Sequence, residues 1–444
     1  MSHPDELPVL LFADPSGKII DFPGLKAAGM SAGSFVQPQR EDFIPLPEGS
    51  ELFVLPSRLP VGCDPESGEP LLLATNPYQP EQPLQAVAAF MSPAHTAIYT
   101  SPYQTSGPEA PRLPLFAYTA VGWHDNRFWA TAFRSDPDPR QDSNQFSQAQ
   151  ITKKTRKQLV KYKRNRLIQH LGKCCLTYGC PAARNYFLGR WEAPLPTSPT
   201  CNARCLGCIS LQPSGCCPST QDRIRFVPSP QELAEIAIPH LENAERPIVS
   251  FGQGCEGEPL LQAEVIEKAI LLIRSKTQNG TINLNSNSSR PDKVARLAAA
   301  GLNSLRVSLN SCQEEYYQNY YRPSDYSFAD VKESIKVMKG AGGFVSLNYF
   351  ILPGVTDSPQ EFQSLCDLIA TCNPDLIQLR NLNMDPEWYL EGIKFKTTER
   401  PMGMRPWLSR LRELFPSLRL GYFNPFLGKE GHEKSPQIPM SGKS

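Results

Sequence analysis

The chain has 444 residues, of which 40% are apolar and 20% are charged, the composition of a globular protein with enough length for two or three domains. A formal net charge of +1 excludes a strong overall attraction for nucleic acids or membrane surfaces. No apolar run is long enough to cross a bilayer and no secretory leader is apparent, so we expect a cytoplasmic protein without a membrane partner.

The first part of the chain, residues 1–150, is predicted to be a β-rich accessory domain of unassigned role. Its short apolar runs are separated by proline, glycine and other turn residues, as in antiparallel sheets. His124 and Asp125 lie near several aromatic residues and could line a site, but we interpret these aromatic residues as packing groups. The runs that predict strands are 9–12, 18–22, 51–55, 96–100, 115–121 and 128–133.

A basic helical linker is predicted over residues 151–190. Lysine and arginine residues crowd positions 153–166, where apolar residues such as Leu159 and Leu167 recur at helix-compatible spacing. Such a helix could contact the phosphates of a nucleic acid. In a chain of near-zero net charge, a solvated connecting helix is the better interpretation.

Residues 191–395 alternate between strand and helix patterns, which predicts an α/β domain with a parallel sheet. Helix starts are marked by capping-box patterns at Ser229 and Ser358 and by a cap candidate at Ser289. Six β/α units of this kind form either an open barrel or a doubly wound sheet. The predicted strands lie just before Cys201 and at 247–251, 281–285, 304–309, 345–352 and 376–382, and the predicted helices at about 230–242, 259–274, 290–300, 326–339 and 359–370.

Residues 396–444 are predicted to be a C-terminal extension. A helix is expected at about 406–415 and a strand at 418–423. The polar tail from Lys429 onward, with its glycine, lysine and serine residues, is expected to be disordered.

The cysteines are the strongest chemical signal in the sequence. Thirteen occur in a chain without an apparent secretory leader, which points to metal or cluster ligands in a reducing compartment. Cys201, Cys205 and Cys208 follow a C-x3-C-x2-C spacing, and three cysteines can hold an iron–sulfur cube while leaving one iron open to a small molecule. Zinc is an alternative, because Cys216 or Cys217 could supply a fourth ligand. A disulfide framework fits this chain less well.

Polar residues recur after successive predicted strands, at the edge of the sheet where parallel β/α folds bind their ligands. The cysteine loop follows the first strand, and residues 252–259 follow the second. Residues 285–287 follow the third strand, and Ser308 and Asn310 end the fourth. Loops with polar groups on one rim predict a single site built from several strand ends.

These motifs resemble the radical S-adenosylmethionine (radical SAM) superfamily. The resemblance is carried by the cysteine motif, by Gly257-Glu258-Pro259 with two following leucines, by Leu284–Asn287 as Leu-Asn-Ser-Asn, and by residues 299–311. It extends over about residues 194–385 and does not reach the first 150 residues. It implies a partial (β/α)6 barrel, open like an incomplete TIM barrel, with the β-rich accessory domain attached.

The resemblance also implies the cofactors and their contacts. Cys201, Cys205 and Cys208 would hold three irons of a [4Fe–4S] cluster, whose fourth iron would bind the amine and carboxylate of S-adenosylmethionine. Flavodoxin or ferredoxin is the kind of electron donor that such an enzyme uses. The remaining cofactor contacts would come from Gly257, Glu258 and Pro259 near the methionine end, from Asn285, Ser286 and Asn287 near the ribose, and from Ser308 on the neighbouring strand. No catalytic residue is assigned, and Arg306 is given no role.

Two positions depart from the family pattern. The residue before the third cysteine is commonly aromatic and packs near the adenine, but here it is Gly207, so the adenine needs another wall. The Gly-Gly-Glu pattern of the second loop here reads Glu256-Gly257-Glu258.

The other cysteines leave two interpretations open. Some superfamily members bind an auxiliary cluster, and the thiols that flank the cysteine loop could do so, although buried thiols without a metal are the better interpretation. The flanking thiols are Cys174, Cys175, Cys180, Cys216 and Cys217, whereas Cys255, Cys312, Cys366 and Cys372 are interpreted as core or loop residues.

The sequence therefore predicts an enzyme that cleaves S-adenosylmethionine reductively and abstracts hydrogen from a substrate. A peptide or protein substrate is weakly favoured over RNA, such as transfer RNA, or a small molecule. The alternative from a different class is a non-catalytic binding protein stabilised by zinc. Metal analysis separates the two classes, since only the enzyme carries iron and sulfide.

Overall fold

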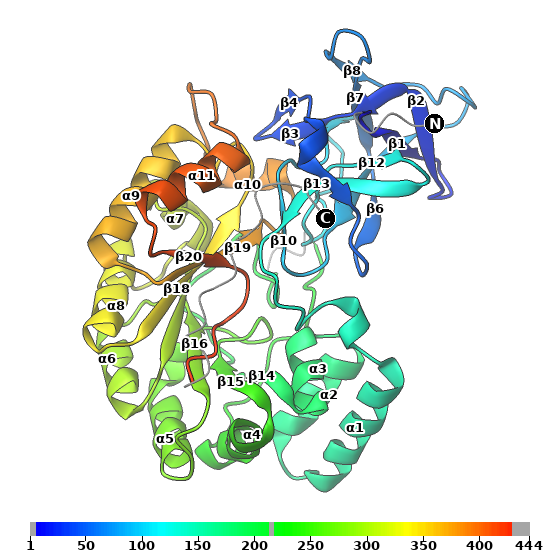
Figure 1. Cartoon of the computed structure of the whole chain (residues 1–444). Coiled ribbons are helices and arrows are strands. Elements are labelled where there is room, and N and C mark those ends of the chain that lie inside the picture. Colours follow the sequence, from blue (N-terminus) through cyan, green and yellow to red (C-terminus); the bar gives the residue numbers. More distant parts are fainter. Residues whose placement is uncertain (1–5, 213–216, 429–444) are drawn as a thin grey trace.

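The structure is a computed structural model that describes residues 6–212 and 217–428, so Cys216 and the polar tail expected from Lys429 lie outside the described residues. It consists of an antiparallel β-rich region, three helices, and a curled parallel sheet covered by helices (Figure 1). None of the helices within the described ranges combines the length and the apolar character that a membrane span needs.

The N-terminal β-rich region confirms the predicted class. Strands β1 and β2 form the expected hairpin, in which the Asp14 carboxylate accepts hydrogen bonds from the Ser16 and Lys18 amides. The expected strand over residues 115–121 is wrong for most of its length, because Pro114 has no N–H to donate to a sheet and the Phe116 amide turns back to its carbonyl oxygen. The strands are β1 (Val9–Ala13), β2 (Ile19–Ala27), β3 (Gly29–Ser31), β4 (Ser34–Val36), β5 (Phe43–Pro45), β6 (Glu51–Leu55), β7 (Arg58–Cys63), β8 (Pro70–Leu72), β9 (Gln85–Phe90), β10 (His95–Ala97), β11 (Tyr103–Thr105), β12 (Val121–His124) and β13 (Arg127–Arg134).

The basic stretch forms more than one helix. Helices α1 (Gln148–Lys161) and α2 (Arg166–Leu176) are separated by a break, because the Asn165 side chain caps α2 by accepting a hydrogen bond from the Ile168 amide. Together with α3 (Pro181–Leu188), they pack beside β14 (Arg190–Pro194) and α4 (Pro230–Asn243).

Within the described residues, seven parallel strands form one curled half-barrel sheet in sequence order, which confirms the partial barrel. They are β14, β15 (Glu245–Phe251), β16 (Thr281–Ser286), β17 (Ser304–Leu309), β18 (Phe344–Ile351), β19 (Leu376–Asn381) and β20 (Arg419–Gly421). The outer face is covered by α4, α5 (Ala263–Arg274), α6 (Pro291–Ala300), α8 (Phe328–Gly340), α9 (Pro359–Cys372) and α11 (Met404–Leu414) (Figure 1). Strand β20 was expected in the C-terminal extension, but it pairs with β19 and so continues the barrel sheet.

The helix-start signals have different outcomes. The capping box at Ser229 is present, since Ser229 and Glu232 exchange both hydrogen bonds. At Ser358 only the serine half forms, because the buried Glu361 carboxylate binds Ser311 and Tyr349 instead. The cap prediction at Ser289 is wrong: Arg290 occupies the N-cap.

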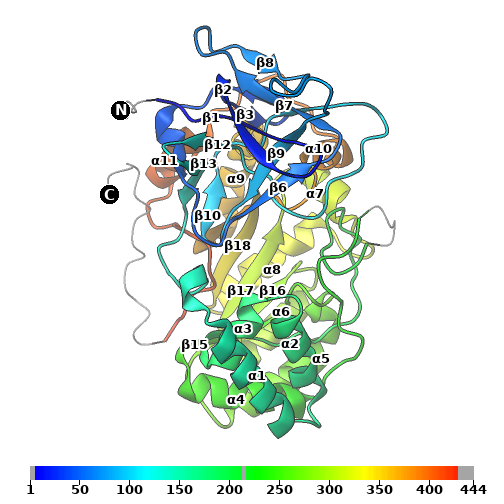
Figure 2. The ribbon, with the colours of Figure 1, turned by 90° about the vertical axis from the view of Figure 1, so that its right-hand side faces the viewer.

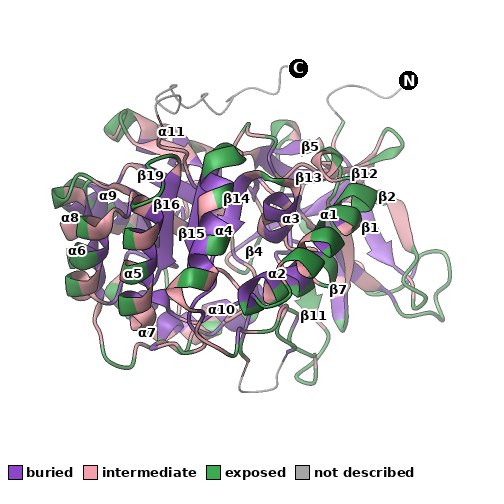
Figure 3. Cartoon of the chain, turned by 90° about the horizontal axis from the view of Figure 1, so that it is seen from below, coloured by how far each residue is buried: buried purple, intermediate pink, exposed green. Residues whose placement is uncertain are grey.

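Two helices that the sequence did not predict, α7 (Glu314–Tyr321) and α10 (Pro386–Ile393), follow β17 and β19. Because they directly follow parallel strands, these two helices stand at the carboxyl rim of the barrel, where a ligand site is expected. In Figure 3, the sheet strands are buried and the helices expose their outward faces.

The β-rich region is fastened to this rim. The buried guanidinium of Arg58 lies 2.9 Å from the Asp385 carboxylate, which also accepts the Leu113 amide and caps α10. Strand β10 contacts β19 of the half-barrel. Figure 2 shows β10 beside the barrel strands, next to the label of β18. Asn381 bonds both His95 and Ala97, so the region covers one side of the open barrel.

We predict that Arg58→Met destabilises the protein by about 3–5 kcal/mol, because it leaves the Asp385 carboxylate buried without its cation. The free energy of unfolding in urea is the measurement. Arg127→Met is the matched control, since Arg127 and Asp125 are 3.8 Å apart with side chains 56% and 55% exposed, and it should change stability by less than about 0.5 kcal/mol. Equal effects of the two substitutions would contradict this role for Arg58.

Candidate cluster and cofactor site

The three cysteines of the C-x3-C-x2-C motif lie on the loop that leaves the carboxyl end of β14. All three are half-buried. Burial raises the pKa of Cys201 to about 11, with the Glu258 carboxylate adding to the shift, and burial together with the two other thiols raises the pKa of Cys205 well above its usual range. Metal binding here would therefore have to displace protons from Cys201 and Cys205, as it does at iron–sulfur sites.

Helix α7 holds the cysteine loop from one side. The amides of Arg204 and Leu206 donate to the carbonyl oxygens of Tyr321 and Tyr320, at 2.9 and 3.0 Å. These are carbonyls of the last turn of α7, which have no partner within the helix. The unpredicted helix therefore sets the position of the loop that carries Cys205.

The loop after β15 holds the cysteine loop from the other side. The amides of Gly257 and Glu258 donate to Ser198 and Thr200, at 2.7 and 2.8 Å. A Cβ atom on Gly257 would lie 1.9 Å from the Thr200 carbonyl oxygen, so the two backbones can approach only because residue 257 is glycine.

Glu256 and Glu258 point their carboxylates into protein rather than solvent. Glu256 accepts the amides of Thr197 and Ser198, just before the cysteine motif. Glu258 accepts the Ser286 hydroxyl at 2.6 Å and the Asn287 amide at 2.8 Å. Burial raises the pKa of each carboxyl to about 7. The pair thus connects the loops after β14, β15 and β16.

The polar residues expected near the ribose are bonded within the protein. The Asn285 side chain donates to Gly252, and the Asn287 side chain donates to Asn202 in the cysteine loop. Ser286 donates to Glu258. The structure therefore brings Glu258, Asn285, Ser286 and Asn287 together with the cysteine loop, through contacts among the loops themselves.

A cavity of about 420 Å³ opens beside the cysteine loop. Cys205, Gly207 and Cys208 form one side of it. Of the predicted cofactor contacts, Ser308 lines this cavity, whereas Gly257, Glu258, Pro259 and Asn285–Asn287 do not. The barrel side is completed by Arg306, Asn348, Phe350 and Arg380, and the β-rich region contributes Phe90, Met91, Ser92 and His95.

Arg306 and Arg380 are cavity residues that sequence reasoning missed. Arg306 lies on the same face of β17 as Ser308, and this two-residue alternation was the available signal. Burial and the nearby Arg380 lower the pKa of Arg306 to about 9. Both guanidiniums bond Gln378, and neither forms an ion pair with an acidic side chain within the described part of the chain. The barrel side of the cavity therefore carries two neighbouring guanidiniums.

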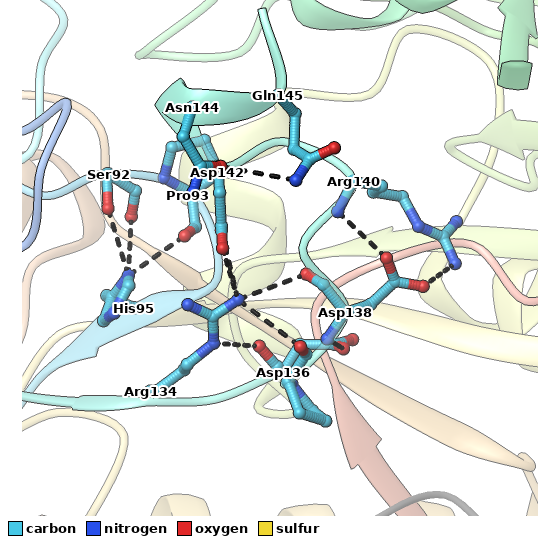
Figure 4. A network of polar contacts seen from close by, with 11 residues as sticks. Ser92, Pro93, His95, Arg134, Asp136, Asp138, Arg140, Asp142, Asn144 and Gln145 are labelled. Atoms are coloured by element: carbon cyan, nitrogen blue, oxygen red, sulfur yellow. Dashed lines mark hydrogen bonds and ion pairs between the residues drawn. The ribbon is translucent and has the colours of Figure 1, made fainter.

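His95 comes from the β-rich region, where Figure 4 shows it within a polar network. Its Nδ1 lies 3.0 Å from the Pro93 carbonyl oxygen and 3.3 Å from that of Ser92, which favours a proton on Nδ1 and leaves Nε2 as the acceptor. Burial lowers the pKa of His95. The same network contains Arg134 and Asp142. His124 and Asp125, considered from the sequence, do not line the cavity.

The chemistry of the donor set tests whether the three cysteines fit a cluster. Within residues 6–212 and 217–428, one group of three potential metal ligands has its ligand atoms within 4.8 Å of one another, and Cys201, Cys205 and Cys208 are not part of it. Sulfurs bound to one zinc ion lie only about 3.8 Å apart. The three sulfurs are therefore not gathered as closely as one zinc ion requires, whereas the cysteines of a four-iron cube bind different iron atoms. Arg223 adds an N–H donor 3.3 Å from the Cys208 sulfur, a contact typical of cluster ligands.

Residues 195–369 match the family model described as the Radical SAM superfamily. No curated protein matches the sequence.

Three solved structures illustrate the similarity. Methylornithine synthase (PylB) is 15% identical, with 54% of this chain and 68% of that one covered and a TM-score of 0.37. The FeFe-hydrogenase maturase HydG from Carboxydothermus hydrogenoformans is 15% identical, with 62% and 70% covered and a TM-score of 0.35. SuiB from Streptococcus suis bound to its precursor peptide SuiA is 12% identical, with 57% and 52% covered and a TM-score of 0.37, so the match spans about half of SuiB.

We predict that Gly257→Ala forces the loops after β14 and β15 apart, destabilising the protein by about 1–3 kcal/mol and lowering the iron bound after anaerobic reconstitution. Unfolding in urea and iron content per chain are the measurements. Gly340→Ala is the control, because beyond its chain neighbours and its own helix backbone its added Cβ meets no atom within 4 Å. A Gly257→Ala protein with wild-type stability and iron content would refute the constraint.

Proposed function

We propose that this chain, which belongs to the radical SAM superfamily, binds a [4Fe–4S] cluster through Cys201, Cys205 and Cys208 and binds S-adenosylmethionine in the adjoining cavity. When bound, the reduced cluster supplies the electron that splits S-adenosylmethionine into methionine and a 5′-deoxyadenosyl radical, which takes hydrogen from a substrate. The observation that carries the proposal is a cavity that two parts of the site share. Residues of the cysteine loop line one side of it, and residues at the ends of barrel strands line another.

In this proposal, the loops after β14, β15 and β16 hold the cofactor. Gly254 and Glu256 line the cavity. We propose that backbone groups of the same loop, at Gly257, Glu258 and Pro259, bind the methionine end. Asn285, Ser286 and Asn287 support the ribose side by fixing the loop positions through their internal hydrogen bonds. Ser308 contacts the cofactor directly from β17.

Phe350 is our candidate for the adenine wall that Gly207 does not provide. Phe350 and Tyr320 both line the cavity, with ring centroids 5.4 Å apart. A Cβ on Gly207 would lie 3.0 Å from the Met384 sulfur and 3.2 Å from the Tyr320 hydroxyl, so side chains from other elements already fill the space beside residue 207. An aromatic face on β18 can stack on a base without any residue at position 207.

The substrate enters between the barrel and the β-rich region. A cavity of about 420 Å³ has room for a cofactor and one reacting group of a substrate. Arg306 and Arg380 would bind a carboxylate or another anionic group. The basic helix α1 packs on α2 and α3 and contributes no cavity residue, so nothing here favours RNA. The enzyme needs an electron donor, for which we propose flavodoxin or ferredoxin in the cytoplasm.

Anaerobically reconstituted protein with dithionite and S-adenosylmethionine should release 5′-deoxyadenosine, measured by chromatography. Cys205→Ala should lose the iron chromophore and this product, whereas Cys63→Ala, in the β-rich region, should keep both. Iron-loaded protein that cleaves no S-adenosylmethionine with any reductant would overturn the proposal. One zinc, with no iron or sulfide, would select the non-catalytic alternative.

Phe350→Ala should weaken S-adenosylmethionine binding about tenfold, since base–aromatic stacking contributes about 1–3 kcal/mol. Equilibrium dialysis of the reconstituted protein gives the dissociation constant. Phe90→Ala removes an aromatic ring from the β-rich wall of the same cavity and should leave the constant within twofold. An unchanged constant in Phe350→Ala would show that the adenine lies elsewhere.

A further inference from the structure

A second group of metal-binding side chains lies apart from the cysteine motif. His170 and Cys174 are four residues apart, so they share one face of α2, and Cys255 comes from the loop after β15. Their ligand atoms all lie within 4.8 Å of one another. Cys174 and Cys255 are buried and His170 is half-buried. Side chains from two distant segments therefore converge on one point.

The spacing of these atoms fits a single tetrahedral ion. With zinc–sulfur bonds of about 2.3 Å and zinc–nitrogen bonds of about 2.0–2.1 Å, bound nitrogen and sulfur atoms lie about 3.6 Å apart. The His170 Nε2 and the Cys174 sulfur are 3.6 Å apart. This close spacing distinguishes the group from Cys201, Cys205 and Cys208, whose sulfurs do not all come this close.

Cys180 is our candidate for the fourth ligand. It is not part of the group whose ligand atoms lie within 4.8 Å of one another, so its side chain would have to turn toward the ion. Its amide donates to the Cys174 carbonyl oxygen at 3.0 Å, and it stands at the N-terminus of α3, directly after the turn that follows α2. Cys175 is turned away, with its sulfur 3.4 Å from the Thr155 hydroxyl. The adjacent Glu256 carboxylate is occupied by backbone amides.

We propose that His170, Cys174 and Cys255 bind one zinc ion, with Cys180 completing a tetrahedral site. One imidazole and three thiolates form a common closed set for structural zinc, and each thiol that binds releases its proton to solvent. Three sulfur ligands and one nitrogen also favour zinc over the hard cations magnesium and calcium.

The ion would fasten the cofactor loop to the helical segment. Cys255 precedes Glu256, whose carboxylate holds the backbone before the cysteine motif. The Cys255 carbonyl oxygen also accepts the Ile224 amide at 2.7 Å. A zinc ion here would tie α2 to the loop that contacts both the backbone before the cysteine motif and Ile224. Zinc binding at this site does not depend on radical chemistry at the cavity.

The test uses the full chain with Cys201, Cys205 and Cys208 all replaced by alanine, so that the radical cluster cannot form. Elemental analysis should find about one zinc per chain with no sulfide, and X-ray absorption at the zinc edge should show three sulfur ligands and one nitrogen. Replacing Cys174 and Cys255 by serine should remove the zinc. Cys175→Ser is the matched control, since this neighbouring thiol faces Thr155, and it should retain the metal.

Several results would overturn the site. Iron with sulfide in the triple alanine chain would show an auxiliary cluster, and metal-free protein with a Cys174–Cys255 disulfide would show a redox pair. Metal-free reduced thiols would show hydrogen bonding alone. If the triple variant does not fold, the zinc-edge measurement on the wild-type holoprotein decides between the same outcomes. Zinc retained by a wild-type protein that releases no 5′-deoxyadenosine would refute the proposed enzyme and leave the zinc site standing.

Discussion

The site depends on two buried carboxylates, those of Glu256 and Glu258. Burying a carboxylate without a cation is unfavourable unless hydrogen-bond donors replace the lost water, and no cation pairs with either group within the described residues. The donors are backbone amides and a hydroxyl from several loops, including Thr197, Ser198 and Asn287. Satisfying the two carboxylates therefore requires these loops to assemble in one arrangement, with the cysteine motif starting three residues after Ser198.

This constraint gives the departure from the family pattern a physical role. Glu256 stands where glycine is common, and its carboxylate holds the backbone that leads into Cys201. Gly257 lies between the two glutamates and permits the close backbone approach to Thr200. Helix α7 holds the opposite side of the cysteine loop, so the loop is fixed from two directions.

The β-rich region has a role in the same arrangement, because it forms one wall of the cavity. The buried Arg58–Asp385 pair and the Asn381 contacts fix this wall against β19 and α10. His95 reaches the cavity from this region, facing a barrel side that carries Arg306 and Arg380. The accessory region and the barrel thus share one cavity, whose barrel side carries two guanidiniums.

The sequence by itself determined the local features of this protein. The cysteine spacing, the order of strands and helices, and the Ser229 cap all depend on residues close together in the chain, where residue spacing and capping are sufficient. The seventh barrel strand, the cavity wall around His95, the bonding of Asn285–Asn287 to other loops, and the meeting of His170 with Cys255 depended on the tertiary structure. These are contacts between distant segments, and they are decided by which buried charges and backbone groups find partners when the elements pack, a condition that no local pattern encodes.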